Sequence, residues 1–595
     1  MTMSKLLAIF LLFFALKYSV CVSVSPFVVS RIKQGIEFFE EDGCNRVIFF
    51  QEWASSSEKV LLNEYISPAI MIWDILKSYG SIIDKLICPF CDGGPVFLRR
   101  SGLWTDGTGT CIYEPRAIYD TSFSVLLVAA VYQCPNRHQV PSHHPSVLSA
   151  LPSFVYIPFF LTNRAGFTIS MLTLITSLVD RGISFHSIEG IIRDQYQQHY
   201  WRRRQQYEED LARSKLKKTE EFPEFCQTFS PFPHEKLINN IFVSFSSLYE
   251  SVFFKDMSER TGTWLSCDHT FKSAANIGFV RESDARWIKL FKCVFCVLNE
   301  CGQILHWRFT RGESFEEVND VFFNLKIRFD LKGVRIQGII IDNCCKWKGM
   351  FSTIFPDVPV KLDLFHAVQR FTKALSHDVR LRSGIAKEYG LIFRHPHDLG
   401  EKRVSPTPDT DTILQNLAGF QRKWSQQTFN GLPVISPAAQ KAIDNIQVHI
   451  QKGCTSCIPS HCSTSRNERL HRELNHILST NRIGLELAFL RCSRIFFRMN
   501  NPSDDSLPSK LCCPSKDTIA ETSRVKHFRI PKTVSLQNAN SAVLGAGKNG
   551  EFKSLKELKA DELLLIRNVI TQSITSCSAL NEHIHIHQLI ILFNL

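Results

Sequence analysis

After its first 25 residues the chain has no apolar run long enough to cross a membrane as a helix, and it has no internal repeat. A membrane-spanning helix needs about 20 consecutive apolar residues, so we expect no stable insertion into a bilayer. The 20 cysteines among 595 residues fall short of the density of a small domain held together by disulfides.

Charge of one sign does not dominate either. The 69 basic and 57 acidic residues leave a net charge of +12, which is compatible with a polyanionic partner but too diffuse to establish one. Apolar residues make up 44% of the chain and charged residues 21%, a composition typical of globular proteins. The length predicts two to four domains.

Residues 1–25 have the layout of a secretory leader. Lys5 precedes an apolar run from Leu6 to Leu16, and small residues follow it. The run is too short for a comfortable membrane span, and by itself it would place the chain in an oxidising compartment. The CxxC pairs found further along instead indicate zinc in a reducing compartment.

Two pairs of potential metal ligands lie in the N-terminal region, residues 30–150. Cys88 and Cys91 form a CxxC pair, and Cys134-x3-His138 follows after 42 intervening residues. Two such pairs on tight turns between strands predict one tetrahedral Cys3His zinc site. Cys111 is a further candidate ligand, and a set of unligated thiols is the alternative.

Residues 151–225 have a helical pattern that predicts a helix-turn-helix. Ile169, Leu172, Ile175 and Val179 follow helical spacing, and Gly182 supplies a stop before a second helix. The densest basic stretch of the chain follows, and it predicts contacts with DNA phosphates. Its members are Arg193, Arg202, Arg203, Arg204, Arg213, Lys215, Lys217 and Lys218.

Two aromatic residues in this stretch, Tyr200 and Trp201, suit stacking. A solvated amphipathic helix of mixed charge is the alternative, because Glu208, Glu209 and Asp210 interrupt the basic run.

From residue 255 to 495 the pattern is that of a mixed α/β domain. Apolar strands and helices follow one another in the order β-β-β-α-β-α-β, which predicts a ribonuclease H-like fold: a mixed sheet with helices on both faces. We read "VPVKLDLFH" as the last strand, and residues 371–450 as a mostly helical insertion.

Two strands of this predicted sheet end in aspartate. "WLSCDHTFK" carries Asp268 and "IIID" ends in Asp342. The first strand lies in the middle of such a sheet, beside the strand that ends in Asp342, so both carboxylates should emerge at one edge. Adjacent carboxylates repel unless a cation lies between them, and oxygen ligands select Mg²⁺ or Mn²⁺. A turn or cap aspartate is the alternative for Asp268 taken alone.

A third carboxylate is expected from a helix packed against the same edge. The segment "CSTSRNERLHRELNHIL", which starts at residue 462, predicts a helix capped by Ser463 or Ser465, with Glu468 in its first turn and Glu473 as the reserve candidate. These two glutamates are five residues apart and would not share a helix face well.

Four blocks in this order carry a resemblance to a known family. "CDHTFK", "IIIDNCCKWKGMF", "FPDVPVKLDLFH" and "STSRNERLHRELN" resemble the blocks of eukaryotic DDE-type cut-and-paste transposases, above all the Mutator-like group. The resemblance covers roughly residues 260 to 490, and the zinc-like and helix-turn-helix regions precede it as in that group. It implies phosphoryl transfer on DNA, with Asp268, Asp342 and Glu468 as catalytic residues that hold the metal ions. Lys272 and Lys346 would contact the DNA backbone.

The chain departs from the family pattern in the "LDLFH" block. Mutator-like elements usually have a cysteine before the histidine of this block, whereas Asp363 stands here. His366 either supports the active site or is a satisfied core histidine, and we favour the core histidine. Four residues in "GCTSCIPSHC", namely Cys454, Cys457, His461 and Cys462, have ligand-like spacing; an incidental set of thiols in a loop is the preferred interpretation.

Residues 501–550 have the composition of a linker, and residues 551–595 are expected to form a helical tail. We expect DNA as partner, zinc and magnesium or manganese as cofactors, and no small-molecule substrate; a homo-oligomer is compatible with this. The expected location is the nucleus, with the leader as a spurious segment and secretion as the alternative. An intact transposase and a domesticated, inactive zinc- and DNA-binding protein remain as two hypotheses.

Overall fold

The structure is a computed structural model that describes residues 116–502 with short gaps and parts of the stretch between residues 32 and 102. The gaps after residue 116 are 152–154, 163–165, 215–220, 226–231, 281–284, 376–378, 399, 401–402, 461, 463–464 and 479–481. The leader, the tail at 551–595 and all but the first two residues of the linker lie outside the described residues. So do Cys111, Lys215, Lys217, Lys218 and His461. Within the described part, no helix combines the length and the apolar character needed to cross a membrane.

The described residues form two compact units. The first comprises those up to Ser177 together with Phe185–Phe245, and the second comprises Leu178–Ser184 together with Ser246 to residue 502. Both contain helices and sheets, so the predicted α/β class is confirmed.

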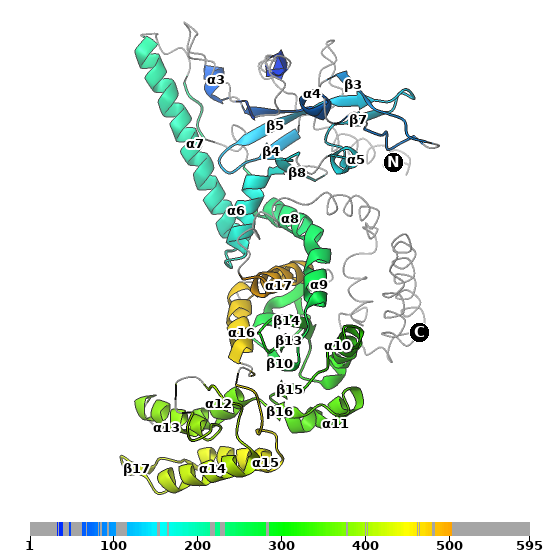
Figure 1. The fold of residues 1–595 in the computed structure, drawn as a ribbon. Coiled ribbons are helices and arrows are strands. Elements are labelled where there is room, and N and C mark those ends of the chain that lie inside the picture. The colour runs from blue at the N-terminus through cyan, green and yellow to red at the C-terminus, as the bar shows by residue number, and fades with distance from the viewer. Residues whose placement is uncertain are drawn as a thin grey trace, which may run out of the picture. The chain divides into compact units, whose positions relative to one another are not determined.

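The first unit contains a six-stranded sheet and a three-stranded sheet (Figure 1). The strands of the larger sheet, in spatial order, are β1 (Val47–Ile48), β2 (Ala69–Trp73), β5 (Ser124–Ala129), β4 (Arg116–Tyr119), β9 (Gly166–Thr168) and β8 (Phe159–Leu161). The smaller sheet has β3 (Arg99–Gly102), β6 (Val131–Gln133) and β7 (Gln139–Pro141). The helices are α3 (Leu62–Ile66), α4 (Ile75–Tyr79), α5 (Pro145–Ser149), α6 (Ile169–Val179), α7 (Phe185–Ser214) and α8 (Glu235–Ser246).

A strand near the start of this unit is hard to recognise in the sequence, where residues 30–80 look irregular and α-rich. The segment "AIMIW" forms β2, which pairs in parallel with β5. All five residues of β2 are buried. A strand covered on both faces is continuously apolar and lacks the period-two alternation that marks a half-exposed strand.

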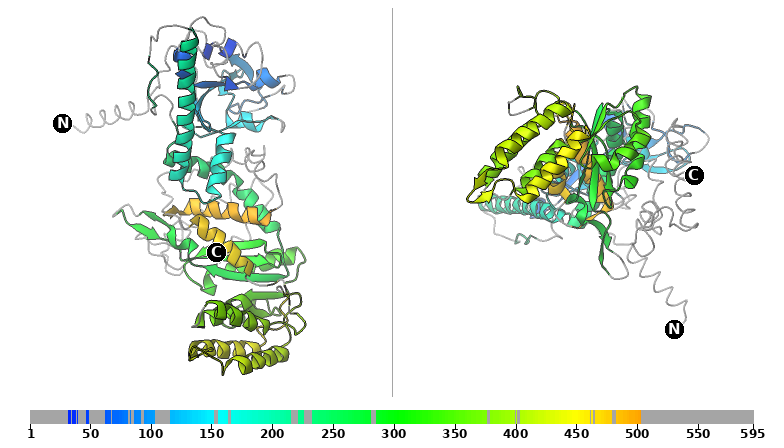
Figure 2. Two further views of the ribbon diagram at one scale, coloured as in Figure 1. Left: turned by 90° about the vertical axis from the view of Figure 1, so that its left-hand side faces the viewer. Right: turned by 90° about the horizontal axis from the view of Figure 1, so that it is seen from below.

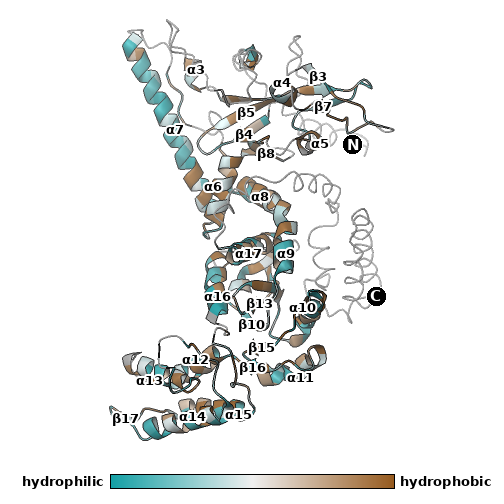
Figure 3. Cartoon of the chain, viewed as in Figure 1, coloured by the Kyte–Doolittle hydropathy of each residue, from teal (hydrophilic) through white to brown (hydrophobic). Residues whose placement is uncertain are grey.

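The helix, glycine turn and helix expected after residue 167 are present as α6 and α7. The turn between them contains Gly182 at φ +77°, in the left-handed region where residues with a side chain are strained. α7 has 30 residues, of which seven at helical spacing are buried. The remaining surface of α7 is mostly hydrophilic (Figure 3).

The second unit is built on a five-stranded mixed sheet (Figure 1). Its strands, in spatial order, are β14 (Ile304–Thr310), β13 (Cys293–Asn299), β10 (Trp264–Thr270), β15 (Gly338–Ile341) and β16 (Val360–Leu362). β10 lies in the centre, antiparallel to β13 and parallel to β15. The predicted central position of the first strand is therefore observed.

Helices cover both faces of this sheet. Alternate residues of each strand point to opposite faces and therefore belong to different cores. Cys267 and Phe295 belong to one core, which also includes residues of α10 (Asn319–Leu331) and α11 (Cys344–Ile354). Val294 and Cys296 belong to the other core, with residues of α16 (Ser465–Leu478) and α17 (Leu485–Asn500).

Smaller elements complete the second unit. They are α9 (Glu250–Glu259), a three-stranded sheet of β12 (Trp287–Lys289), β11 (Ile277–Val280) and β19 (Ile483–Gly484), and the 3-10 turns Ser247–Tyr249, Ser273–Asn276 and Phe315–Glu317.

Residues 371–450, for which the sequence predicts a helical insertion, are mostly helical. Figures 1 and 2 show the helices that come after β16 in the chain lying next to one another. They are α12 (Leu364–Ala374), α13 (Val379–Leu391), α14 (Thr410–Trp424) and α15 (Pro437–Gln451), with a small hairpin of β17 (Thr428–Phe429) and β18 (Leu432–Pro433) before α15. Phe371 of α12 stacks on Tyr389 of α13 with ring centroids 3.9 Å apart.

The strand predicted for "VPVKLDLFH" ends earlier than expected. β16 stops at Leu362, and Asp363 is the N-cap of α12, accepting hydrogen bonds from the backbone N–H groups of Phe365 and His366 at 3.3 and 2.9 Å. An aspartate that caps a helix stops the strand before it, so His366 lies in the first turn of a helix.

Candidate metal centres

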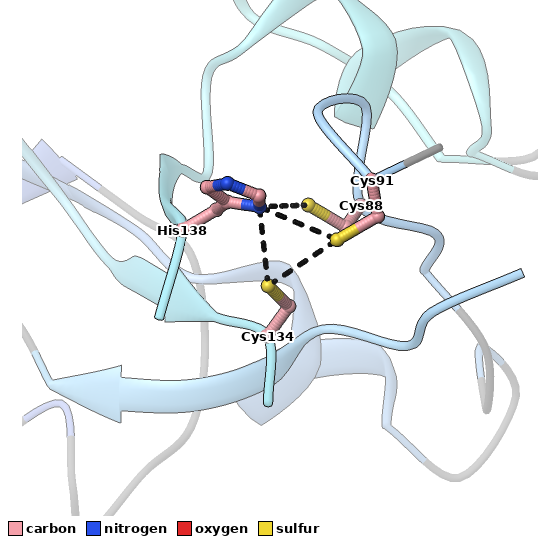
Figure 4. A group of neighbouring side chains, drawn as sticks. All are labelled: Cys88, Cys91, Cys134 and His138. Atoms are coloured by element: carbon pink, nitrogen blue, oxygen red, sulfur yellow. Dashed lines mark hydrogen bonds between the residues drawn. The ribbon is translucent and has the colours of Figure 1, made fainter. Parts of the chain in front are cut away.

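The first unit brings together the two predicted ligand pairs (Figure 4). Cys91 Sγ lies 3.3 Å from His138 Nδ1 and 3.7 Å from Cys134 Sγ, and Cys88 Sγ lies 3.8 Å from His138 Nδ1. Zinc held at about 2.3 Å by thiolates and about 2.0–2.1 Å by an imidazole would separate neighbouring ligand atoms of a tetrahedron by about 3.5–3.8 Å. The observed distances match this tetrahedron.

Local backbone structure holds these ligands in place. The Cys88 N–H group donates to Val96 O at 2.7 Å, which folds the CxxC loop back on itself. On the β6–β7 hairpin, the Cys134 N–H group donates to His138 O at 3.2 Å, and Arg137 has φ +62°. The Asn136 amide donates to Cys91 Sγ at 3.3 Å, as an outer partner of a metal ligand would. The convergence of the four residues is confirmed, and the group could hold a metal such as zinc.

The second unit carries a group with carboxylates at the edge of its sheet. The register of β10 with β15 pairs Cys267 with Ile341, so Asp268 and Asp342 follow at the same end of two neighbouring parallel strands. Asp268, Glu468 and His471 each offer one ligand atom within 4.8 Å of the others. Glu468 lies in the first turn of α16.

Asp268 is buried, and its environment suits a cation. Its side chain is 9% exposed; Oδ1 accepts a hydrogen bond from the His269 N–H group at 2.8 Å. Oδ2 has no hydrogen-bond donor among the described residues. Burial, opposed by His366 and reinforced by the charges of Asp363 and Asp342, raises the pKa of Asp268 to about 7. A metal ion at Oδ2 would reverse this effect.

His366 faces this group and is not a core histidine, so the preferred interpretation of it is wrong. Its Nδ1 lies 2.6 Å from Asp363 Oδ2, and its Nε2 lies 3.6 Å from Glu468 Oε1 and 4.0 Å from Asp268 Oδ2. Burial disfavours the charged ring, but the hydrogen bond to Asp363 and the nearby carboxylates prevail and raise the pKa of His366 to about 9. An imidazolium therefore stands between the two carboxylates.

His471 has the opposite electrostatic character. It is buried on α16, and its Nδ1 lies 3.9 Å from Asp268 Oδ2. Burial together with the charge of His366 lowers the pKa of His471 to about 4, so the ring is neutral at pH 7 and able to act as a ligand. It occurs three residues after Glu468, a helical spacing that could have revealed it in the sequence.

Asp342 does not belong to the group of three ligand atoms. Its Oδ1 accepts a 2.6 Å hydrogen bond from Arg370 Nη2, a residue of α12. The reserve candidate Glu473 is exposed and is not in this group of described ligands either. Lys272 and Lys346 are both exposed.

The alternative metal site of Cys454, Cys457, His461 and Cys462 is not among the ligand groups of the described residues, which do not include His461. Cys457 is exposed and Cys462 is buried with Trp264, Ile340 and Ile458. Cys454 instead joins Cys344, Cys345 and His449 in a further group of potential ligands. The sequence signal for this group is the adjacent pair Cys344-Cys345, which one residue, Asn343, separates from Asp342.

The basic stretch on α7 is only partly available to a polyanion. Arg193, Arg204 and Arg213 form ion pairs with acidic residues three or four positions away on the same helix. Tyr200, expected to stack, is 2% exposed, whereas Trp201 is 58% exposed with the Arg204 guanidinium 5.3 Å from its ring centroid. The described part of α7 thus has the mixed charge of the alternative interpretation, with Arg202 exposed and Arg203 half-buried.

No protein-family model matches the chain, and no curated protein is significantly similar to it. Its function must therefore be inferred from the residues themselves.

Proposed function

We propose that the second unit is a DDE-type, ribonuclease H-like domain that cleaves and transfers DNA strands with divalent metal ions. One observation carries the proposal: Asp268 and Asp342 lie at the same end of the paired segments of two neighbouring parallel strands, and Glu468 reaches Asp268 from a helix. The strand order β14-β13-β10-β15-β16, with the carboxylates on the two central parallel strands, supports the ribonuclease H-like assignment.

The residues present fit Mg²⁺ or Mn²⁺. Carboxylate oxygens are the ligands that these ions prefer, and the buried Asp268 Oδ2 lacks a hydrogen-bond donor among the described residues. The neutral ring of His471 adds a nitrogen ligand that suits Mn²⁺ better than Mg²⁺. When bound, such ions activate a water or a 3′-hydroxyl and stabilise the leaving oxygen of a phosphodiester.

The chain's own cations complete the site. His366 supplies a positive charge between Asp268 and Glu468, which lowers the cost of holding two carboxylates close together. Arg370 neutralises Asp342, and its half-exposed guanidinium can move to a DNA phosphate once a metal ion takes its place.

Nicking of a supercoiled plasmid and of a labelled duplex in Mn²⁺ or Mg²⁺ tests the proposal. Asp268→Asn and Glu468→Gln should lower the rate by about 100-fold or more, because each removes charge that binds the metal. Binding of the duplex should persist in both variants. Glu473→Gln is the matched control on the same helix and should retain nearly the full rate. Metal-independent nicking, or equal loss in the control, would reject the assignment.

A specific observation favours a second candidate function. The Arg370–Asp342 ion pair neutralises one carboxylate without a metal ion, as expected for a domesticated protein that binds zinc and DNA but performs no chemistry. A wild-type chain that binds the duplex and cleaves nothing in either ion would establish this alternative.

DNA as partner, a homo-oligomeric assembly and a nuclear location belong to the same proposal. A fluorescent fusion of the full chain should accumulate in the nucleus. A fusion that is cleaved near Cys21 and appears in the medium would instead support the secreted alternative, in which the transposase-like site would have no role.

A further inference from the structure

A second tetrahedral group of thiols and imidazole lies in the second unit. Cys345 Sγ lies 3.4 Å from His449 Nδ1 and 3.7 Å from Cys454 Sγ. Cys344 Sγ lies 3.6 Å from His449 Nδ1 and 3.9 Å from Cys345 Sγ. These separations repeat those of the group in the first unit, and they match the edges of about 3.5–3.8 Å expected around tetrahedral zinc.

The ligands come from both sides of the helical insertion. Cys344 and Cys345 begin α11, two residues after Asp342. His449 lies in the last turn of α15, and Cys454 follows in the loop after that helix. The group therefore joins the end of the insertion to the strand-to-helix junction that carries Asp342.

The loop that carries Cys454 is held in shape by its backbone. Gly453 has φ +69°, and the Cys454 N–H group donates to His449 O at 2.9 Å. Cys454 O accepts a hydrogen bond from the Leu362 N–H group at 2.9 Å, and Gly453 O accepts one from Lys361 Nζ at 2.8 Å. Both partners belong to β16, so the loop is fixed against the sheet without help from the thiols.

Two ordinary explanations of clustered cysteines do not account for this arrangement. A disulfide requires sulfur atoms about 2.05 Å apart, whereas these lie 3.7 and 3.9 Å apart. Core packing explains the buried Cys344 but not the exposed Cys345, whose thiol lies against another thiol and a histidine nitrogen rather than in apolar surroundings.

We propose that Cys344, Cys345, His449 and Cys454 bind one structural Zn²⁺, which fastens α15 to the junction between β15 and α11. Three thiolates and one imidazole form a closed tetrahedral donor set, typical of structural rather than catalytic zinc. This site is separate from the carboxylate group, and the proposal does not require that the protein cleaves DNA strands. It gives the adjacent cysteines after Asp342 a function that the transposase resemblance does not assign.

Zinc analysis of the purified full chain tests this proposal. The wild type should contain about two equivalents of zinc, one for each Cys3His group. Cys345→Ser, at an exposed position, and Cys454→Ser should each retain about one equivalent, and so should Cys88→Ser. The matched control is Cys457→Ser, which changes an exposed thiol three residues beyond Cys454 and should keep both equivalents.

Replacement of zinc by Co²⁺ identifies the ligands at each site. The wild type should show the intense visible and thiolate charge-transfer absorption of tetrahedral Co²⁺, and Cys345→Ser should lose about half of it. One equivalent of zinc in the wild type, or an unchanged zinc content in a soluble Cys345→Ser protein, would overturn the proposal. If Cys454→Ser aggregates, Cys345→Ser alone decides the outcome. Because the readout is metal content, an inactive wild type would reject the transposase proposal without affecting this one.

Discussion

Arg370 Nη2 donates a 2.6 Å hydrogen bond to Asp342 Oδ1, so a guanidinium occupies the charge-neutralising position that a metal ion would take at this carboxylate. Arg370 is half-exposed and lies within the first two turns of α12, which begins at Leu364. A metal ion that binds Asp342 must therefore displace the guanidinium of Arg370.

Arg370→Gln should strengthen Mn²⁺ binding to the DNA-free protein several-fold, because the metal no longer displaces a guanidinium from Asp342. Titration followed by electron paramagnetic resonance of free Mn²⁺ measures the change. Lys373→Gln, three positions along the same helix, is the control and should leave the affinity unchanged. Weaker Mn²⁺ binding in Arg370→Gln would mean that Arg370 organises the site rather than competing for it.

The contributions of Asp268 and His366 to the stability of the metal-free protein should fall as pH rises, between about 4 and 7 for Asp268 and between 6.5 and 9 for His366, whereas the lowered pKa of buried histidines such as His471 acts in the opposite direction below pH 6.5. The folded-state pKa of Asp268 is raised from 3.8 to about 7, so ionising it costs stability as pH rises through this range. The folded-state pKa of His366 is raised from 6.5 to about 9, so its contribution is present below pH 6.5 and is lost as pH rises to 9. In both cases the native state binds more protons than the unfolded state, so stability decreases.

Urea unfolding of the wild type and of Asp268→Asn at pH 5, 7 and 9 in buffer without Mg²⁺ separates the contribution of Asp268 from those of the other titrating groups. Asp268→Asn should be more stable than the wild type at pH 8, by up to about 4 kcal/mol, because the asparagine carries no buried charge. The difference should shrink toward pH 4. A variant that is less stable than the wild type at pH 8 would show that the carboxylate is compensated by its neighbours.

His366→Gln should strengthen Mn²⁺ binding at pH 7 and should change it less at pH 9. The His366 imidazolium lies 3.6 Å from Glu468 Oε1 and 4.0 Å from Asp268 Oδ2, so it competes with a metal ion for these carboxylates. The pKa of His366 is about 9, so part of this charge is already lost at pH 9. Mn²⁺ titrations at the two pH values detect the difference. Weaker binding at both pH values would mean that His366 organises the site, and His269→Gln, on β10, serves as the control.

Cys88→Ser should release one zinc equivalent and expose the loops around residues 88–138 to proteases. Zinc that closes this loop contributes directly to folding free energy, so the cost should be several kcal/mol. Limited proteolysis with mass spectrometry locates the new cleavage sites. Cys301→Ser, at an exposed thiol outside the metal groups found among the described residues, should leave both zinc content and cleavage pattern unchanged.

Local spacing was enough to predict the first metal group. The pairs Cys88-Cys91 and Cys134-His138 each lie on one turn or hairpin, so a few residues of sequence fix their geometry. The order of strands was enough to predict that Asp268 and Asp342 lie at the same end of adjacent parallel strands, although β10 continues past Asp268 to Thr270. The position of Glu468 followed from the start of α16.

Other features depend on contacts between segments that no periodicity links. Cys344 and Cys345 meet His449 and Cys454 only because the insertion returns to β16, and no spacing within the sequence links these two segments. His366 faces Glu468 because Asp363 caps α12 at that point instead of continuing a strand. The sequence alone determined the central strand β10, the helices after β16 and the short-range ligand pairs, since these depend on neighbouring residues, whereas β2 and the end of β16 were not predicted. Only tertiary packing decided which distant side chains share a site, because their approach depends on how whole elements cover the sheet.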